Sequence, residues 1–232
     1  MKSIALVTGL LSTAVVPVAS TAAPIVFDNR DQFIQNVEPN ASEDFESATP
    51  GATYDTQPLT VGQFRFQGGI PTNNPLQFNV IAPGGDCIAL YSVNGSQDAC
   101  SLVERGNPLT IEFLSPITAW GADFRDIANA GRQTALSFFA EDDTLLNRTV
   151  LQGYDLYELT FFGVDLLGQA AAYARFDFLG IETSDLAIDI FAMDDIVYSI
   201  DRGGDMPPPV PLPAGFFLML TAMAGLTLRT RL

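Results

Sequence analysis

The chain has 232 residues, of which 27 are acidic and 11 are basic, and it contains no histidine. This length accommodates one domain with a substantial core, and the absence of histidine excludes Ser-His-Asp and Cys-His catalysis and His-ligated zinc. The acidic excess disfavours nucleic acid as a partner; it attracts cations or reflects a salty environment. The sequence has no glycine-rich phosphate-binding motif either. Any enzyme built from it would depend on carboxylates, tyrosines or a hard metal ion.

The first 22 residues have the pattern of a signal peptide. Lys2 supplies a positive charge, Ile4–Val18 an apolar run, and Ser20–Ala22 the small residues that precede a cleavage site. We expect signal peptidase to cut after Ala22, because a cut after Ala23 would place Pro24 directly behind the cleaved bond. The sequence therefore predicts that the protein is exported.

Residues 23–200 are predicted to form one domain of the all-β class. A single stretch indicates a helix: Asn29 is a suitable N-cap for Arg30–Val37, in which Phe33 and Val37 lie on one face. Elsewhere apolar and polar residues alternate, which is typical of strands, and turn-forming residues separate the runs. The expected strands are Ile25–Phe27, Glu43–Ser47, Leu59–Phe66, Leu76–Ile81, Cys87–Ser92, Leu109–Phe113, Ile117–Arg125, Thr134–Ala140, Thr144–Leu151, Glu158–Val164, Ala172–Leu179 and Leu186–Ile200. Many short strands without an internal repeat indicate an antiparallel β-sandwich of jelly-roll-like form.

The two cysteines, Cys87 and Cys100, are separated by twelve residues. In an exported protein such a pair is expected to form a disulfide, which here closes the polar loop Ile88–Ala99. A nucleophilic or metal-binding role is disfavoured, because the chain has no histidine to partner a thiolate.

The C-terminal part differs in composition from the rest. Asp201–Pro209 is rich in glycine and proline and is predicted to be a linker. The motif Val210-Pro211-Leu212-Pro213-Ala214 follows, then an uncharged apolar run to Leu228, then Arg229 and Arg231. At about 1.5 Å per helical residue, the run from Ala214 is roughly 22 Å long, which is marginal for a permanent membrane span but sufficient for a transient anchor with cytoplasmic arginines.

This order of motif, apolar run and basic end resembles a protein-sorting signal of the PEP-CTERM type, in its VPLPA variant. The resemblance implies a hydrophobic sorting helix that anchors the protein transiently in the inner membrane. Processing by an exosortase-type enzyme then leaves it at the cell surface or outside the cell. The alternative is an ordinary single-span anchor. Without Lys2, Arg229 and Arg231, 8 of the 11 basic residues remain against all 27 acidic ones, a net charge of −19.

Two short acidic motifs resemble the ends of jelly-roll carbohydrate-binding and lectin-like sandwiches. They are Asp44-Phe45-Glu46-Ser47 and Asp194-Asp195-Ile196-Val197-Tyr198. In such families the early and late strands lie side by side and hold a calcium ion, which implies a structural calcium with the ligands Asp44, Glu46, Asp194 and Asp195. Alternation along a strand would place Phe45 in the core. The alternative is that Asp194 and Asp195 end a strand at the solvent.

Three aromatic residues are candidate ligand contacts. Tyr154 and Tyr157 stand beside acidic residues in an expected loop, where they either contact a glycan or cover a sheet edge. Trp120, the only tryptophan, shares a strand face with Ala122 and Phe124. That placement favours a role in the core over stacking on a sugar.

The sequence leaves two classes of function open. The first is a non-catalytic surface or extracellular-matrix protein that binds extracellular polysaccharide or has a purely structural role. The second is a secreted carboxylate-based glycosidase or polysaccharide lyase; glycosidases need two carboxylates about 5–10 Å apart across a cleft. Among 27 acidic residues such a pair always occurs, so a pair alone is no evidence for an enzyme. We expect no catalytic residue and no cofactor besides calcium.

The predicted disulfide can be tested directly. Neither cysteine of the exported protein should react with an alkylating agent until a reductant is added. Cys87→Ser should lower the melting temperature by a few degrees, because a bridge closing a loop of this size contributes about 3 kcal/mol. Free thiols in the folded protein would contradict the prediction.

Overall fold

The computed structural model describes residues 22–68, 79–82, 93, 97–129, 131–152, 154, 159–181 and 188–201. Nearly all of the predicted signal peptide and of the predicted linker, and the VPLPA tail with its expected helix, lie outside these residues. Within the part of the chain that is described, no helix is long and apolar enough to cross a membrane.

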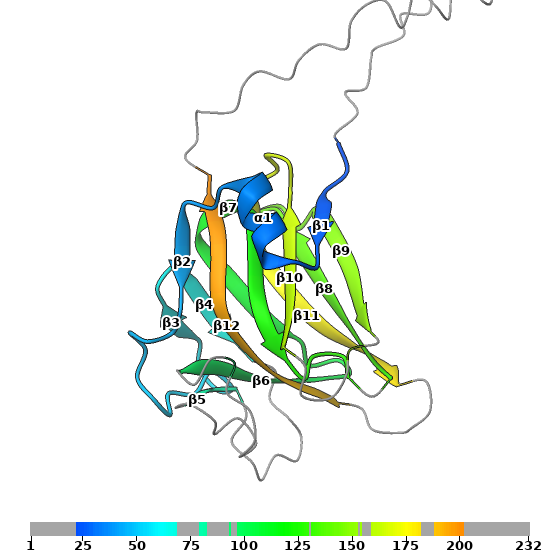
Figure 1. Cartoon of the computed structure of the whole chain (residues 1–232). Helices are drawn as coiled ribbons and strands as arrows, with labels where there is room; N and C mark the ends of the chain where they lie inside the picture. The colour runs from blue at the N-terminus through cyan, green and yellow to red at the C-terminus, as the bar shows by residue number, and fades with distance from the viewer. Residues whose placement is uncertain are drawn as a thin grey trace, which may run out of the picture.

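Twelve strands and one helix make up the described fold (Figure 1). In chain order they are β1 (Ile25–Phe27), α1 (Arg30–Val37), β2 (Ala41–Glu43), β3 (Leu59–Val61), β4 (Phe64–Gln67), β5 (Val80–Ala82), β6 (Asp98–Glu104), β7 (Leu109–Arg125), β8 (Arg132–Phe139), β9 (Leu145–Gln152), β10 (Leu159–Asp165), β11 (Ala171–Ile181) and β12 (Ile188–Ile200).

The long strand β7 belongs to both layers of an open sandwich (Figure 1). Its first part, Leu109–Phe113, pairs with β11 and β4, whereas Ala119–Arg125 pairs with β10 and β12. Pro116, which has no N–H to donate to a neighbouring strand, stands between the two parts. The first layer has the order β9-β8-β11-β7-β4-β3 and the second β1-β10-β7-β12, with β2 and β6 both on the far edge of β12. All strand pairings are antiparallel, so the predicted all-β sandwich is confirmed.

Two expected strands are shorter than predicted, because residues with positive φ interrupt them. Gly62 (φ +53) divides Leu59–Phe66 into the hairpin of β3 and β4. Phe45 (φ +58) turns the chain after Glu43, so that the expected strand Glu43–Ser47 becomes a turn following β2. Local alternation does not reveal such turns.

At two other places the structure contains more strand than the sequence predicts. Leu109–Phe113 and Ile117–Arg125 are one continuous strand, β7, rather than two. The sequence pattern does not predict strand β6, because its first residues belong to the polar stretch between the two cysteines. In the structure Asp98 and Ser101 are both buried on β6, one on each face.

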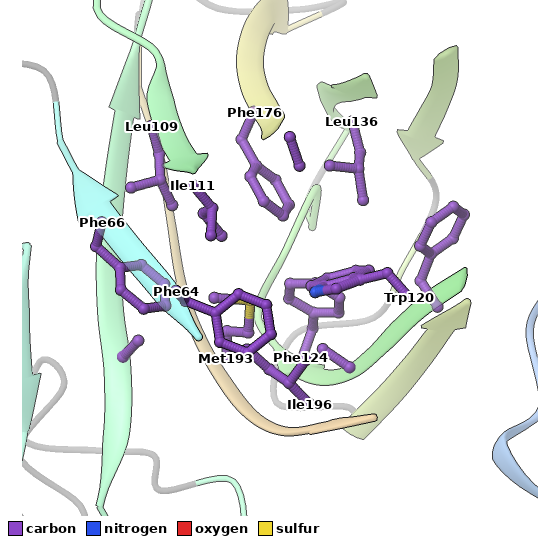
Figure 2. Packing of buried hydrophobic residues seen from close by; sticks show 14 of the residues in the cluster. Phe64, Phe66, Leu109, Ile111, Trp120, Phe124, Leu136, Phe176, Met193 and Ile196 are labelled. Atoms are coloured by element: carbon purple, nitrogen blue, oxygen red, sulfur yellow. The ribbon is translucent and has the colours of Figure 1, made fainter. Parts of the chain in front are cut away.

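Aromatic side chains fill the space between the layers (Figure 2). The ring of Trp120 lies 6.0 Å from that of Phe124, 5.8 Å from Phe138 and 6.4 Å from Phe176, measured between centroids. Trp120 and Phe124 are fully buried, so the predicted core role of the tryptophan is confirmed. Each such ring contributes on the order of 1.5–3 kcal/mol through its burial.

The helix α1 covers the outer face of the second layer, with the predicted bounds. The side chain of Asn29 accepts a hydrogen bond from the N–H of Gln32 at 2.9 Å, which caps the helix. Phe33 is fully buried against Phe161 of β10, with 5.6 Å between the ring centroids, and Val37 packs against the same cluster. One apolar face of a short helix thus fixes it to the sheet.

The chain enters and leaves the described fold at one end of the second layer. Ile25 pairs with Asp165, Asp165 with Ala119, and Ala119 with Ser199, in one row across four adjacent strands. Since neighbouring strands lie about 4.8 Å apart, the start of β1 and the end of β12 are separated by only about 14 Å.

Gly121→Ala tests the contact between the helix and the second layer. An added Cβ would lie 2.5 Å from Cζ of Phe161 and 3.3 Å from the Cα of Gly163. The variant should lose about 1–3 kcal/mol of unfolding free energy in chemical denaturation, as overpacked sites do. Gly106→Asn is the control, because Gly106 lies in open space at φ +85, which asparagine tolerates better than most residues. Equal losses in both variants would contradict this account.

Candidate functional site

The strand directly before the first acidic motif lies beside the second motif. Strand β2 pairs with β12, with Glu43 opposite Ile196, and Phe45 is fully buried. Asp44 and Glu46, however, lie in the turn after β2 and are exposed. An oxygen of Asp44 accepts the N–H of Glu46 at 3.1 Å. The motif therefore supplies a buried phenylalanine and a hydrogen-bonded turn.

Asp194 and Asp195 form a β-bulge inside β12. The register between β12 and β7 shifts between Asp194 and Val197, and Asp195 has φ +48. Asp194 is fully buried, and its carboxylate accepts the N–H of Asp195 at 2.7 Å. The alternative prediction, that this pair ends a strand at the solvent, is wrong.

The described contacts do not gather the four predicted calcium ligands into one site. The carboxylates of Asp44 and Asp194 each accept a backbone N–H of their own segment, and that of Glu46 accepts the N–H of Gln97 at 2.9 Å. Among the residues that the structure describes, no group of three acidic or cysteine side chains is arranged to hold a metal ion. Calcium at this place therefore stays a prediction.

Arg30, the first residue of α1, connects the bulge to the rest of the second layer. Its guanidinium donates to the carbonyl oxygen of Asp195 and pairs with the carboxylate of Asp123 at 2.9 Å. It also lies 5.1 Å from the ring centroid of Phe161. Burial raises the pKa of Asp123, and the charge of Arg30 opposes that shift. Sequence analysis missed this residue because its three partners lie far away in the chain.

Two other buried aspartates hold loops at the opposite end of the strands. Asp98 is fully buried; one of its oxygens accepts the N–H of Val93 at 3.3 Å, and the other has no hydrogen-bond partner among the described residues. Burial raises the pKa of Asp98 to about 7. Asp189 accepts from the N–H of Ala128 at 2.8 Å and the hydroxyl of Thr134 at 2.6 Å, and burial raises its pKa to about 6. Both pKa values are therefore raised by burial at positions where the carboxyl groups hold loops.

The remaining predicted site residues fall partly within the described structure. Cys100 is buried on β6 and is not a free thiol. Its predicted partner Cys87 lies outside the described residues, so the pairing stays a prediction. Tyr154 is half-buried and packs against the core, which agrees with the alternative of a loop that covers a sheet edge. Tyr157 and the sorting motif Val210–Ala214 lie outside the described residues.

The outer face of the first layer carries an aromatic pair that sequence analysis missed. Phe139 of β8 and Tyr173 of β11 are cross-strand partners, with ring centroids 4.8 Å apart and ring planes at 12°. The guanidinium of Arg175 lies 5.2 Å from the ring centroid of Phe139 and pairs with Asp177 at 2.8 Å. We call these four residues the β8–β11 face. The alternation of Tyr173, Arg175 and Asp177 along one strand was the available signal.

Comparison with known proteins gives similar solved structures only. No protein-family model and no curated protein sequence matches the chain. The K2 cleaved adhesin domain of Lys-gingipain superposes with a TM-score of 0.46 and 14% identity, covering 69% of this chain and 97% of that one. The K3 adhesin domain of Lys-gingipain from Porphyromonas gingivalis W83 gives 0.41 and 12%, covering 69% and 99%. The CBM22-1–GH10 modules of Clostridium thermocellum xylanase 10B give 0.32 and 12%, covering 69% and 28%.

Asp98→Asn should reduce the pH dependence of stability. The pKa of Asp98 is about 7 in the folded protein against an ordinary value of 3.8, so the folded state holds this proton more tightly than the unfolded chain. The unfolding free energy should therefore fall as the pH rises from about 4 to about 7, and it should fall less in the variant. Denaturant titrations across this range measure the difference.

The matched control is Asp142→Asn, the same substitution in the exposed hairpin between β8 and β9. A hydrogen bond from Thr144 lowers the pKa of Asp142, so its contribution has the opposite sign. This variant should not reduce the decline with rising pH. Identical pH profiles for the wild type and Asp98→Asn would contradict the assignment to Asp98.

Proposed function

We propose that this chain is an exported, non-catalytic surface or extracellular-matrix protein. Its β-sandwich, of jelly-roll-like form, binds extracellular polysaccharide. Its C-terminal tail anchors it transiently in the inner membrane until an exosortase-type enzyme processes it. The proposal joins the targeting signals of the sequence to the sandwich described above.

The observation that carries the proposal is the position of the two chain ends. Ile25 and Ser199 lie in one row of the second layer, about 14 Å apart. A domain tethered through its C-terminal tail is then held by one end only. The outer face of the first layer and the opposite end of the strands stay accessible to a large extracellular ligand.

The roles of the buried carboxylates support binding rather than catalysis. Asp98 and Asp189 have the raised pKa values that a general acid requires, and they would be the first candidates in a glycosidase. Both are nevertheless buried, and their oxygens accept hydrogen bonds from backbone N–H groups that fix loops. Replacing Asp98 or Asp189 should therefore lower the stability of the fold rather than remove a catalytic group.

Intact mass measurement tests the targeting half of this proposal. Protein recovered from the cell surface or medium should begin at Ala23 and lack the residues that follow the Val210–Ala214 motif. Replacing Pro211 and Pro213 together by alanine should leave unprocessed protein in the membrane fraction. A surface-resident protein that still ends at Leu232 would contradict it.

A further inference from the structure

We propose that the β8–β11 face, extended by Glu112 of β7 and Arg65 of β4, is a binding site for a neutral polysaccharide. This inference rests on the proposed function, because it assigns the place and the ligand class of the polysaccharide binding. The site lies on the outward side of paired strands of the first layer.

The residues of the site form one row across four adjacent strands. Phe139 pairs with Tyr173, Tyr173 with Glu112, and Glu112 with Arg65. Their sequence neighbours Phe138, Ala174, Ile111, Phe64 and Phe66 are buried in the core, so alternation directs the row outward. Three interstrand spacings give it a length of about 14 Å, which suits several sugar units of an extended chain.

The aromatic part of the row is held in place before any ligand arrives. The rings of Phe139 and Tyr173 stack at 4.8 Å, and the guanidinium of Arg175 lies over Phe139. The hydroxyl of Tyr173 donates to the carboxylate of Asp143 at 2.8 Å. Since both rings stand on paired strands and are fixed by contacts on several sides, binding would cost little side-chain entropy.

Ion pairs flank the aromatic pair on two sides. Arg175 pairs with Asp177 at 2.8 Å, and Arg65 with Glu112 at 3.2 Å. The side chains of Arg65 and Glu112 are 47% and 53% exposed, so their outer donors and acceptors face the solvent. Sugar hydroxyl groups both donate and accept hydrogen bonds, and paired guanidinium and carboxylate groups offer both partners at fixed spacing.

The charge balance of this face selects a neutral ligand. The mature chain has a net charge of −19, yet three of its eight arginines, Arg65, Arg148 and Arg175, lie on this one face. The carboxylates Glu112, Asp143 and Asp177 lie beside them, and Glu141 and Asp142 of the adjoining hairpin add further negative charge, so this face has no positive excess. A polyanion would find no net positive charge here and would meet an acidic protein around it, whereas a neutral chain meets no electrostatic barrier.

A protein partner fits this face less well. A stable protein interface buries about 800 Å² on each side around an apolar centre. The apolar side chains of this face are the rings of Phe139 and Tyr173 together with the exposed Leu145 and Val150 of β9, and the pairs Arg175–Asp177 and Arg65–Glu112 interrupt this apolar area. Aromatic rings beside planar hydrogen-bonding groups suit a carbohydrate chain.

The test compares binding of the folded protein to neutral polysaccharides (xylan, galactomannan, dextran) and to anionic ones (alginate, polygalacturonate) by affinity electrophoresis and calorimetry. The wild type should bind a neutral probe, and raising the salt concentration should change the affinity little. Tyr173→Ala and Arg175→Gln should each weaken binding at least about tenfold. Tyr173→Phe, which keeps the ring, should retain most of it.

The matched control is Leu114→Ala, because Leu114 is 56% exposed on β7 but lies outside the row. Its affinity should equal that of the wild type, and circular dichroism should show every variant folded. If the wild type binds none of the probes, the polysaccharide-binding half of the proposed function fails together with this site. If it binds and Tyr173→Ala binds equally well, only the site is wrong. Binding to the anionic probes alone would overturn the ligand class.

Discussion

The two layers of this sandwich share the strand β7. Four strands, β4, β10, β11 and β12, pair with it directly, and the remaining strands are added to these four. Leu109–Phe113 orders the first layer and Ala119–Arg125 the second. Because one continuous strand enters both layers, the inward side chains of both converge on one core around Trp120 and Phe124 (Figure 2). The same sharing places the two outer faces, which carry different chemistry.

The outer face of the second layer is occupied by the protein itself. Helix α1 covers β7 and β10, and Arg30 joins the bulge at Asp195 to Asp123. Several carboxylates are buried in or beside this layer, which is costly in a chain of such negative charge unless each is paired or protonated. Asp98 lowers this cost through a raised pKa, which favours its neutral form, and Asp123 lowers it through its ion pair with Arg30.

The outer face of the first layer has no helix over it in the described structure (Figure 1). Arg65 pairs with Glu112 and Arg175 with Asp177 on this face. Its aromatic residues lie on the outer surface of the sheet, although most aromatic side chains of this protein fill the core. An aromatic pair left outside a core rich in phenylalanine is the feature that folding alone does not require. The proposed polysaccharide site gives it a role.

Local pattern determined much of the secondary structure. The cap at Asn29 and the alternation around Trp120 act over a few residues, so the helix α1, the strand β1 and the burial of Trp120 could be predicted. The turn at Phe45 and the continuity of β7 could not, because packing against distant strands overrides local alternation.

The sequence by itself determined the all-β class, the helix and the composition of the core, since these follow from periodicity and capping between near neighbours. Only the tertiary structure decided the roles of the charged and aromatic side chains. Arg30 meets Asp195 across 165 positions, and Tyr173 meets Phe139 across a strand pair. Such contacts depend on which strands become neighbours and in which register, and a shift of one residue would have sent Tyr173 into the core.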